Sequence, residues 1–251
     1  MPGRIQSLER GAALLSLLGA ADELSLAELA DSLDLPRPTV HGLLATLVHV
    51  GFVHQDAATR RYSLGSAVTT LGAAALDPHD LRSHATSWCD SLAARTRAEV
   101  LVGMSDGDAV AVVHHVFRPD GSPQRLRVGE RLPLHATGLG KALLAAVPGA
   151  HRAGLGLDRF TSRTISSATA LAAVLDDVRR RGWATGVGEH RAEVGDVAAP
   201  IRGAGGLVVG SVACTGPVDR LFAADGRPRV DVAAAVSATA LAIGRAVVAP
   251  R

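Results

Sequence analysis

The segment LPRPTVHGLLATLVHVGFV, residues 35–53, decides how the first part of the chain folds. Apolar residues recur in it at intervals of three and four, as they do along the buried side of an amphipathic helix: Val40, Leu43, Leu44 and Leu47. The opposite side carries polar residues such as Arg37 and His41. No Asp or Glu occurs from residue 35 to residue 55, although both flanking positions are acidic. The predicted helix therefore has a polar face without carboxylates.

Two further helical patterns precede this segment, and two short extended pieces follow it. The first pattern covers residues 5–19, and the second starts at Ser25, where SLAE is a capping box in which Glu28 reaches back to the serine amide. The inward residues that we expect in the first helix are Leu8, Leu15 and Leu18. FVHQD and RYSL flank the turn AATR and predict a β-hairpin over residues 52–64. Three helices and a hairpin form the winged helix-turn-helix arrangement.

The carboxylate-free helix indicates binding to DNA. A helix in the major groove lies close to two rows of phosphates, which repel Asp and Glu. We expect the helix start to contact phosphates, the exposed face to contact bases, and the hairpin tip to contact phosphate or the minor groove. The predicted DNA-binding residues are, in that order, Arg37, Pro38 and Thr39; His41, Gly42 and Ala45; Arg60 and Arg61. Residues 1–64 hold five arginines and seven acidic residues, so the prediction depends on local charge, and a protein-interaction role is the alternative.

The rest of the chain alternates helical and extended patterns. Helices are predicted at 81–96, 141–146 and 168–181 and over the apolar run at 230–248, which we expect to pack inside the protein and not to span a membrane. The predicted strands are EVLVGMS, AVAVVHHVF, QRLRV, WATGV, VAAPIRG and LVVGSVACT. Hairpins between helices indicate an α+β fold with an antiparallel sheet. The predicted organisation is a winged helix at 1–64, a linker helix at 65–79 and a second domain at 80–251.

Composition and motifs argue against an enzyme. The chain has 251 residues, 47% hydrophobic and 20% charged, with a net charge of +2 that implies no partner by itself. It contains no GxSxG, HExxH or GxxxxGK[ST] motif and no GxGxxG after a strand. Adjacent residues on a strand point to opposite faces, so His114 and His115 do not suit one metal ion. We therefore expect no catalytic residue, metal or cofactor, and a cytoplasmic protein because no signal peptide is visible. An enzyme with an appended regulatory domain is the less favoured alternative.

Taken together, the motifs resemble the IclR family of bacterial transcriptional regulators. The resemblance rests on IQSLERGAALLSLLG, LSLAELADSLDLPRPTVHGLLATLVHVGFVHQD, RRYSLG, VGERLPLHATGLGKALLA and RRRGWATGVGEHRAEVGDVAAPIRGAGGLVVGSVACTGP, and so covers nearly the whole chain. HGLLATLVHVGFV is in addition similar to the regulators of glycerol operons in actinobacteria. The resemblance implies a winged helix-turn-helix domain, a linker helix, a GAF- or PAS-like effector-binding domain, and dimers or tetramers on palindromic operators.

The resemblance also implies a ligand-responsive regulator, such as a repressor, of a metabolic operon. Its effector pocket would be lined by the loop after LPLHAT, the VGD segment and the strand VACTG. The implied effector-binding residues are Gly138, Leu139, Val194, Asp196, Ala213 and Thr215. The expected effector is a polyol, a sugar phosphate or a small organic acid. The alternative is a regulator that binds DNA constitutively and uses its second domain only to oligomerise.

Several positions depart from the family's usual residues. Many members have a cysteine in place of Asp196, a hydroxyl residue in place of Ala213 and an acid in place of Gly186, and Gly42 replaces a large polar residue. An ionised Asp196 in a pocket requires a hydrogen-bond donor or a cation, which favours an effector with hydroxyl groups or an amine. The alternative is that Asp196 faces solvent or pairs with Arg191.

Overall fold

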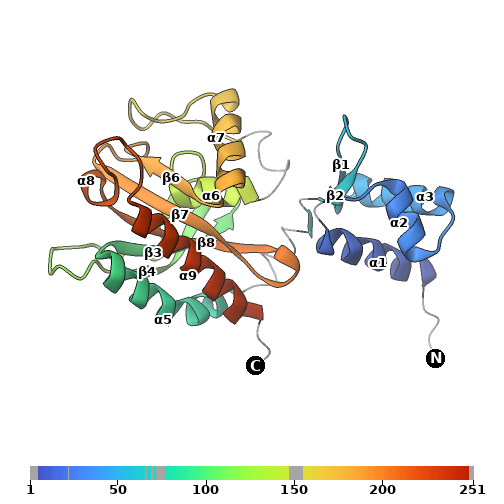
Figure 1. Cartoon of the computed structure of the whole chain (residues 1–251), viewed down its shortest axis with the longest axis horizontal. Coiled ribbons are helices and arrows are strands. Elements are labelled where there is room, and N and C mark those ends of the chain that lie inside the picture. The colour runs from blue at the N-terminus through green and yellow to red at the C-terminus, as the bar shows by residue number, and fades with distance from the viewer. Residues whose placement is uncertain are drawn as a thin grey trace. The chain divides into compact units, whose positions relative to one another are not determined.

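The computed structural model describes residues 5–21, 23–65, 67–68, 71, 77–146 and 155–248. It divides into two compact units: the first three helices with the first hairpin, and the elements from residue 78 onward (Figure 1). The linker helix expected at 65–79 falls largely outside the described residues. The domain boundaries at residues 64 and 80 therefore stay predictions.

The first unit has the predicted three helices and a hairpin. Its elements are α1 (Gln6–Ala20), α2 (Leu26–Leu33), α3 (Arg37–His49), β1 (Val53–Gln55) and β2 (Tyr62–Leu64). Val40 and Leu44 of α3 are fully buried, as their spacing predicts. The prediction of the inward residues of α1 is partly wrong, because Leu8 is 68% exposed and the buried residues are Leu14 and Leu18. Residues four apart lie on one face of a helix, so Leu14 and Leu18 together point into the core.

The predicted capping box at the start of α2 is confirmed. The Glu28 amide donates to the Ser25 hydroxyl, and the Ser25 amide donates to the Glu28 carboxylate over 2.7 Å. The helix ends at Asp34, whose φ of 50° lies in the left-handed region and turns the chain sharply. Pro36 then directly precedes α3. These local contacts set the tight connection between α2 and α3.

The second unit is built on one antiparallel six-stranded sheet with the order β5-β4-β3-β8-β7-β6. Its strands are β3 (Glu99–Asp106), β4 (Ala109–Val116), β5 (Arg131–Pro133), β6 (Ala184–Val187), β7 (Val194–Arg202) and β8 (Val208–Pro217). The predicted α+β class is therefore confirmed. The predicted strand QRLRV is wrong, because 124–128 form a loop in which Leu126 is exposed and the Arg127 amide donates to the His115 ring.

Helices cover both faces of this sheet (Figure 1). The helices of one face are α5 (Pro78–Thr96) and α9 (Val230–Val248), those of the other are α6 (Gly138–Ala146) and α7 (Ala168–Arg181), and α8 (Val218–Leu221) follows β8. In the described part of the chain, α9 alone is long and apolar enough to cross a membrane. Its residues Val236, Ala240 and Ile243 are buried in the core that includes the sheet. This agrees with the packing role predicted for the C-terminal apolar run.

Candidate nucleic-acid interface and effector pocket

The exposed face of α3 carries most of the residues predicted to bind DNA. Arg37, His41, Gly42 and Ala45 are exposed, and Thr39 is half-buried. The first turn of the helix has no acidic residue and no side-chain cap. The face is therefore open to a polyanion along its whole length.

The backbone amides at the start of α3 offer less than a helix N-terminus usually does. The amides of Thr39 and Val40 donate to the Pro36 carbonyl oxygen over 2.9 and 3.2 Å, and Pro38 has no N–H group. Among the described residues no acceptor takes the Arg37 amide. A phosphate at this end would be bound mainly by the backbone and side chain of Arg37.

The two arginines of the hairpin take different roles. Arg60 is exposed at the turn, with a φ of 59°. Arg61 turns back, because its guanidinium donates to the Glu28 carboxylate over 2.9 Å and to the Glu23 carbonyl over 3.1 Å. In this structure Arg61 attaches the hairpin to the start of α2, and the contact of both arginines with DNA stays a prediction.

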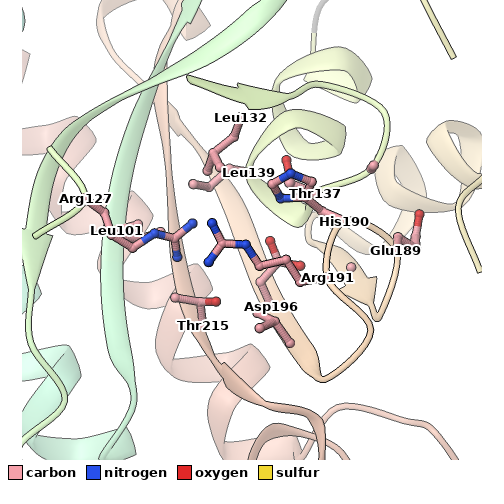
Figure 2. Close-up of a pocket in the computed structure, with 13 residues that line it drawn as sticks. Leu101, Arg127, Leu132, Thr137, Leu139, Glu189, His190, Arg191, Asp196 and Thr215 are labelled. Atoms are coloured by element: carbon pink, nitrogen blue, oxygen red, sulfur yellow. The ribbon is translucent and has the colours of Figure 1, made fainter. Parts of the chain in front are cut away.

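The second unit contains a polar cavity between the sheet and the start of α6 (Figure 2). Four of the expected effector residues line it: Leu139, Val194, Asp196 and Thr215. The other two do not, because Gly138 lies behind the Asp196 carboxyl and Ala213 is buried in the core on this face. The free volume of the cavity is about 30 Å³. That is room for only a few waters at about 10–15 Å³ each, so the cavity suits a small ligand.

Asp196 faces this cavity from β7. Its carboxylate accepts a hydrogen bond of 2.7 Å from the amide of Gly138, the first residue of α6. Desolvation raises the pKa of Asp196 to about 6, although the nearby Lys141 ammonium and the Gly138 amide both lower it. Pairing with Arg191, the alternative considered above, does not occur, because Arg191 binds Glu130 over 3.0 Å.

The space for the Asp196 side chain depends on a glycine across the sheet. Gly186 of β6 is its cross-strand partner. A Cβ atom at residue 186 would lie 2.2 Å from Asp196 Oδ1, and one at Gly138 would lie 3.0 Å from Asp196 Cγ. The identities of residues 186 and 196 are therefore coupled: the carboxyl group at 196 fits because 186 has no side chain.

A buried ion pair lies beside Asp196. Lys141 of α6, the only lysine of the chain, is 1% exposed and its Nζ is 2.5 Å from Glu189 Oε1. Within the described part of the chain, Glu189 Oε2 is buried without a hydrogen-bond donor. Sequence reasoning did not assign this pair to the pocket. The sequence did contain a signal for this pair. A single lysine in an arginine-rich chain indicates a position that suits a compact ammonium group better than a planar guanidinium.

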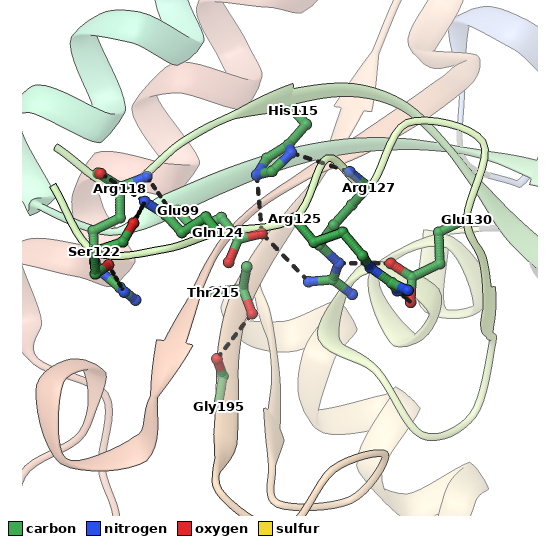
Figure 3. Close-up of polar contacts among 10 residues, drawn as sticks. All are labelled: Glu99, His115, Arg118, Ser122, Gln124, Arg125, Arg127, Glu130, Gly195 and Thr215. Carbon is green, nitrogen blue, oxygen red and sulfur yellow. Dashed lines mark hydrogen bonds and ion pairs between the residues drawn. The ribbon is translucent and has the colours of Figure 1, made fainter. Parts of the chain in front are cut away.

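Two arginines extend toward each other across the cavity (Figure 2). Arg127 pairs with Glu130 over 2.7 Å, and Arg191 pairs with the other oxygen of Glu130. His115 orders the Arg127 loop, because its Nδ1 accepts from the Arg127 amide and its Nε2 lies 3.0 Å from Glu99 Oε1 (Figure 3). Burial lowers the pKa of His115 and raises that of Glu99. Sequence reasoning missed Arg127 because it assigned the residue to a strand.

The architecture defines a class: a winged helix with a carboxylate-free face, followed by an antiparallel α+β domain with a small polar cavity, is that of a transcriptional regulator. Comparison with protein families gives the same result. The C-terminal domain of the bacterial transcriptional regulator IclR matches residues 73–245, and the IclR helix-turn-helix domain matches residues 7–57. The chain belongs to the IclR family of bacterial transcriptional regulators.

Similar proteins agree with this assignment. The glycerol operon regulatory protein of Streptomyces coelicolor is 44% identical over 248 residues, which cover 98% of this chain and 97% of that protein. The regulator XynR of Escherichia coli is 31% identical and covers 78% of this chain and 80% of its own. A transcriptional regulator from Rhodococcus sp. RHA1 is similar in structure, with 29% identity, a TM-score of 0.61, and coverage of 97% and 98%. The predicted resemblance is thus confirmed, and these relatives are named as regulators.

Proposed function

We propose that this chain is an effector-responsive regulator that binds operator DNA through α3 and the hairpin and binds a small polyol or polyol phosphate in the cavity beside Asp196. The exposed, carboxylate-free face of α3 is the observation that supports DNA binding. The relative from Streptomyces coelicolor is named for a glycerol operon, which supports an operon of polyol use here.

The DNA-binding proposal assigns distinct tasks to neighbouring residues. Arg37, at the start of α3, binds a phosphate and so contributes affinity that does not depend on sequence. His41, one turn further, faces base edges together with Gly42 and Ala45. Arg60 contacts phosphate or the minor groove from the hairpin. This arrangement separates affinity from specificity along one helix.

Replacing Arg37 with alanine is expected to weaken binding about tenfold on every DNA sequence, because a charge-assisted contact is lost. The slope of log affinity against log salt should become less negative by about 0.9, the value of one phosphate contact. His41→Ala serves as the matched variant and should change base preference with little effect on the salt slope. Fluorescence anisotropy with the upstream promoter fragment measures both; an unaltered affinity and slope for Arg37→Ala would refute the placement of α3.

The contacts around Asp196 define the chemistry of the effector. The Asp196 carboxylate already accepts from the α6 amide of Gly138, so a ligand carboxylate placed there would meet a like charge. The acceptors near the cavity, Asp196 and the unpartnered oxygen of Glu189, favour hydroxyl donors. Arg127 and Arg191, which extend toward each other across the cavity, suit a phosphate if it displaces Glu130 from one of them. A three-carbon polyol meets these demands, whereas its phosphate would bind only if the cavity widened, because the free space holds only a few waters.

Calorimetric titration of the full chain with glycerol and with glycerol 3-phosphate, at millimolar concentration or below, tests the effector proposal. We expect saturable binding of at least one of them, and Asp196→Ala should weaken it about tenfold, because a hydrogen bond to a charged group is lost. Pyruvate is the control and should bind neither protein. Unchanged affinity in Asp196→Ala would refute the role of this residue. Failure of every small polyol and acid to bind would favour the constitutive regulator.

The proposed mechanism couples the two units in a dimer. Two winged domains read two half-sites of a palindromic operator, one or more helical turns apart. The spacing would be set by the linker at 65–79. An effector changes operator affinity only in so far as it binds one arrangement of the dimer better than the other.

A further inference from the structure

A second and larger cavity lies in the same unit. It encloses about 330 Å³, within the range of about 300–1,000 Å³ that small-molecule sites occupy. Four arginines from separate parts of the chain line it: Arg97, Arg118, Arg220 and Arg229. Asp219 is the one acidic residue on its described wall. A concave site with this many guanidinium groups is suited to a compact polyanion.

The charges of the arginines are only partly balanced. Asp120 pairs with Arg118 over 2.6 Å and with Arg220 over 2.8 Å. Arg229 donates to two backbone carbonyls, those of Arg220 and Asp219. Among the described residues, neither Arg97 nor Arg229 has a carboxylate partner within ion-pair distance. The cavity therefore retains positive charge and unused N–H donors.

The backbone at Arg97 supports a functional role. Arg97 ends α5 with φ 53° and ψ 28°, in the left-handed region. Glycine or asparagine is the usual residue at this point of a helix, because a side chain with a normal Cβ is strained there. Strained residues that persist are concentrated at functional sites. Arginine at this position adds a guanidinium to the cavity.

We propose that this cavity binds a small phosphorylated metabolite of up to nucleotide size, as a second ligand distinct from the effector beside Asp196. The planar donors of arginine match phosphate oxygens in pairs. A concave site of this volume with Asp219 in its wall suits a small molecule better than a nucleic-acid backbone.

The two cavities share one wall residue. Thr215 lines both of them, and its hydroxyl donates to the Gly195 carbonyl oxygen (Figure 3). Its cross-strand partner Glu99 lies 3.7 Å from Arg127 of the effector cavity. Burial raises the pKa of Glu99, and the charge of Arg118, which lines the second cavity, opposes this shift together with that of Arg127. The two cavities therefore adjoin at Thr215.

Calorimetric titration of the full chain with inorganic pyrophosphate, at constant ionic strength and without divalent metal, tests the proposal. The test variant is Arg97→Asn with Arg229→Gln, because asparagine tolerates the left-handed backbone and glutamine keeps a donor for the two carbonyls. We expect saturable binding to the parent chain and affinity reduced about tenfold or more in the double variant. The matched control is Arg180→Gln with Arg245→Gln, which removes the same charge from exposed sites outside both cavities and should bind like the parent.

Two further variants distinguish this cavity from the DNA-binding face and from the cavity beside Asp196. Arg37→Ala should bind pyrophosphate like the parent, because the DNA-binding face is not the site measured. Asp196→Ala should also bind like the parent, so failure of the effector proposal leaves this one standing. Parent-like tryptophan fluorescence in the double variant verifies its fold. Absence of saturable binding, or equal affinity in the parent and a folded double variant, would overturn the proposal.

Discussion

Replacing Asp196 with asparagine is expected to stabilise the second unit at neutral pH. The carboxyl group has a pKa of about 6 in the folded chain and an ordinary value of 3.8, so ionisation at pH 7 costs folding about 3 kcal/mol. Below pH 4 it is protonated in both states and the cost vanishes. Because the folded pKa is the higher one, the parent loses stability as pH rises from 4 through 6, and the asparagine variant does not. Asparagine still accepts a hydrogen bond from the Gly138 amide.

Urea unfolding followed by tryptophan fluorescence measures this difference. Both tryptophans of the chain, Trp88 and Trp183, lie in the second unit, so the signal reports this unit alone. The control is Asp158→Asn, which removes an exposed carboxyl group of the same unit. The free-energy gap between Asp196→Asn and the parent should widen from pH 4 to pH 7 by more than the gap between the control and the parent. A gap that is constant with pH would show that the Asp196 carboxyl is not desolvated.

Replacing Gly186 with alanine is expected to destabilise the second unit by about 1–3 kcal/mol, the usual cost of overpacking. The added Cβ atom would lie 2.2 Å from Asp196 Oδ1 and displace the carboxyl group from the Gly138 amide. Most of this cost should disappear when Asp196 is also alanine. Residues in direct contact give such non-additive effects.

The same fluorescence-detected unfolding at pH 7 completes the double-mutant cycle. Gly216→Ala is the control: Gly216 also lies in the sheet, but a Cβ atom there meets no other atom within 4 Å. It should change stability by less than about 0.5 kcal/mol. Equal costs of Gly186→Ala in the parent and in Asp196→Ala would contradict the steric coupling.

The fold was predictable where the pattern was long or chemically explicit. The periodicity of α3, the capping box at Ser25 and the alternating helices and hairpins each specify local structure without distant contacts. The prediction failed at 124–128, where QRLRV has strand composition but the Arg127 amide binds the His115 ring twelve residues away. The prediction that Leu8 is buried also failed. Periodicity predicts which face of a helix is apolar, but it does not predict how far along the helix the neighbouring elements cover that face.

The candidate site was predictable only in part, for a similar reason. Asp196 and Thr215 lie on the cavity because the motifs place them on strands beside the loop before α6. The pairing of Lys141 with Glu189 joins residues 48 positions apart, and no spacing rule connects them. Arg61 carries the same charge as Arg60, yet only the folded hairpin reveals that it is paired with Glu28.

The contact between positions 186 and 196 restricts which pairs of residues the sheet can hold at those two places. A side chain at 186 would begin 2.2 Å from Asp196 Oδ1, so a larger residue there requires a smaller one at 196. Redesign of ligand selectivity in this scaffold should therefore exchange the two positions in a single step.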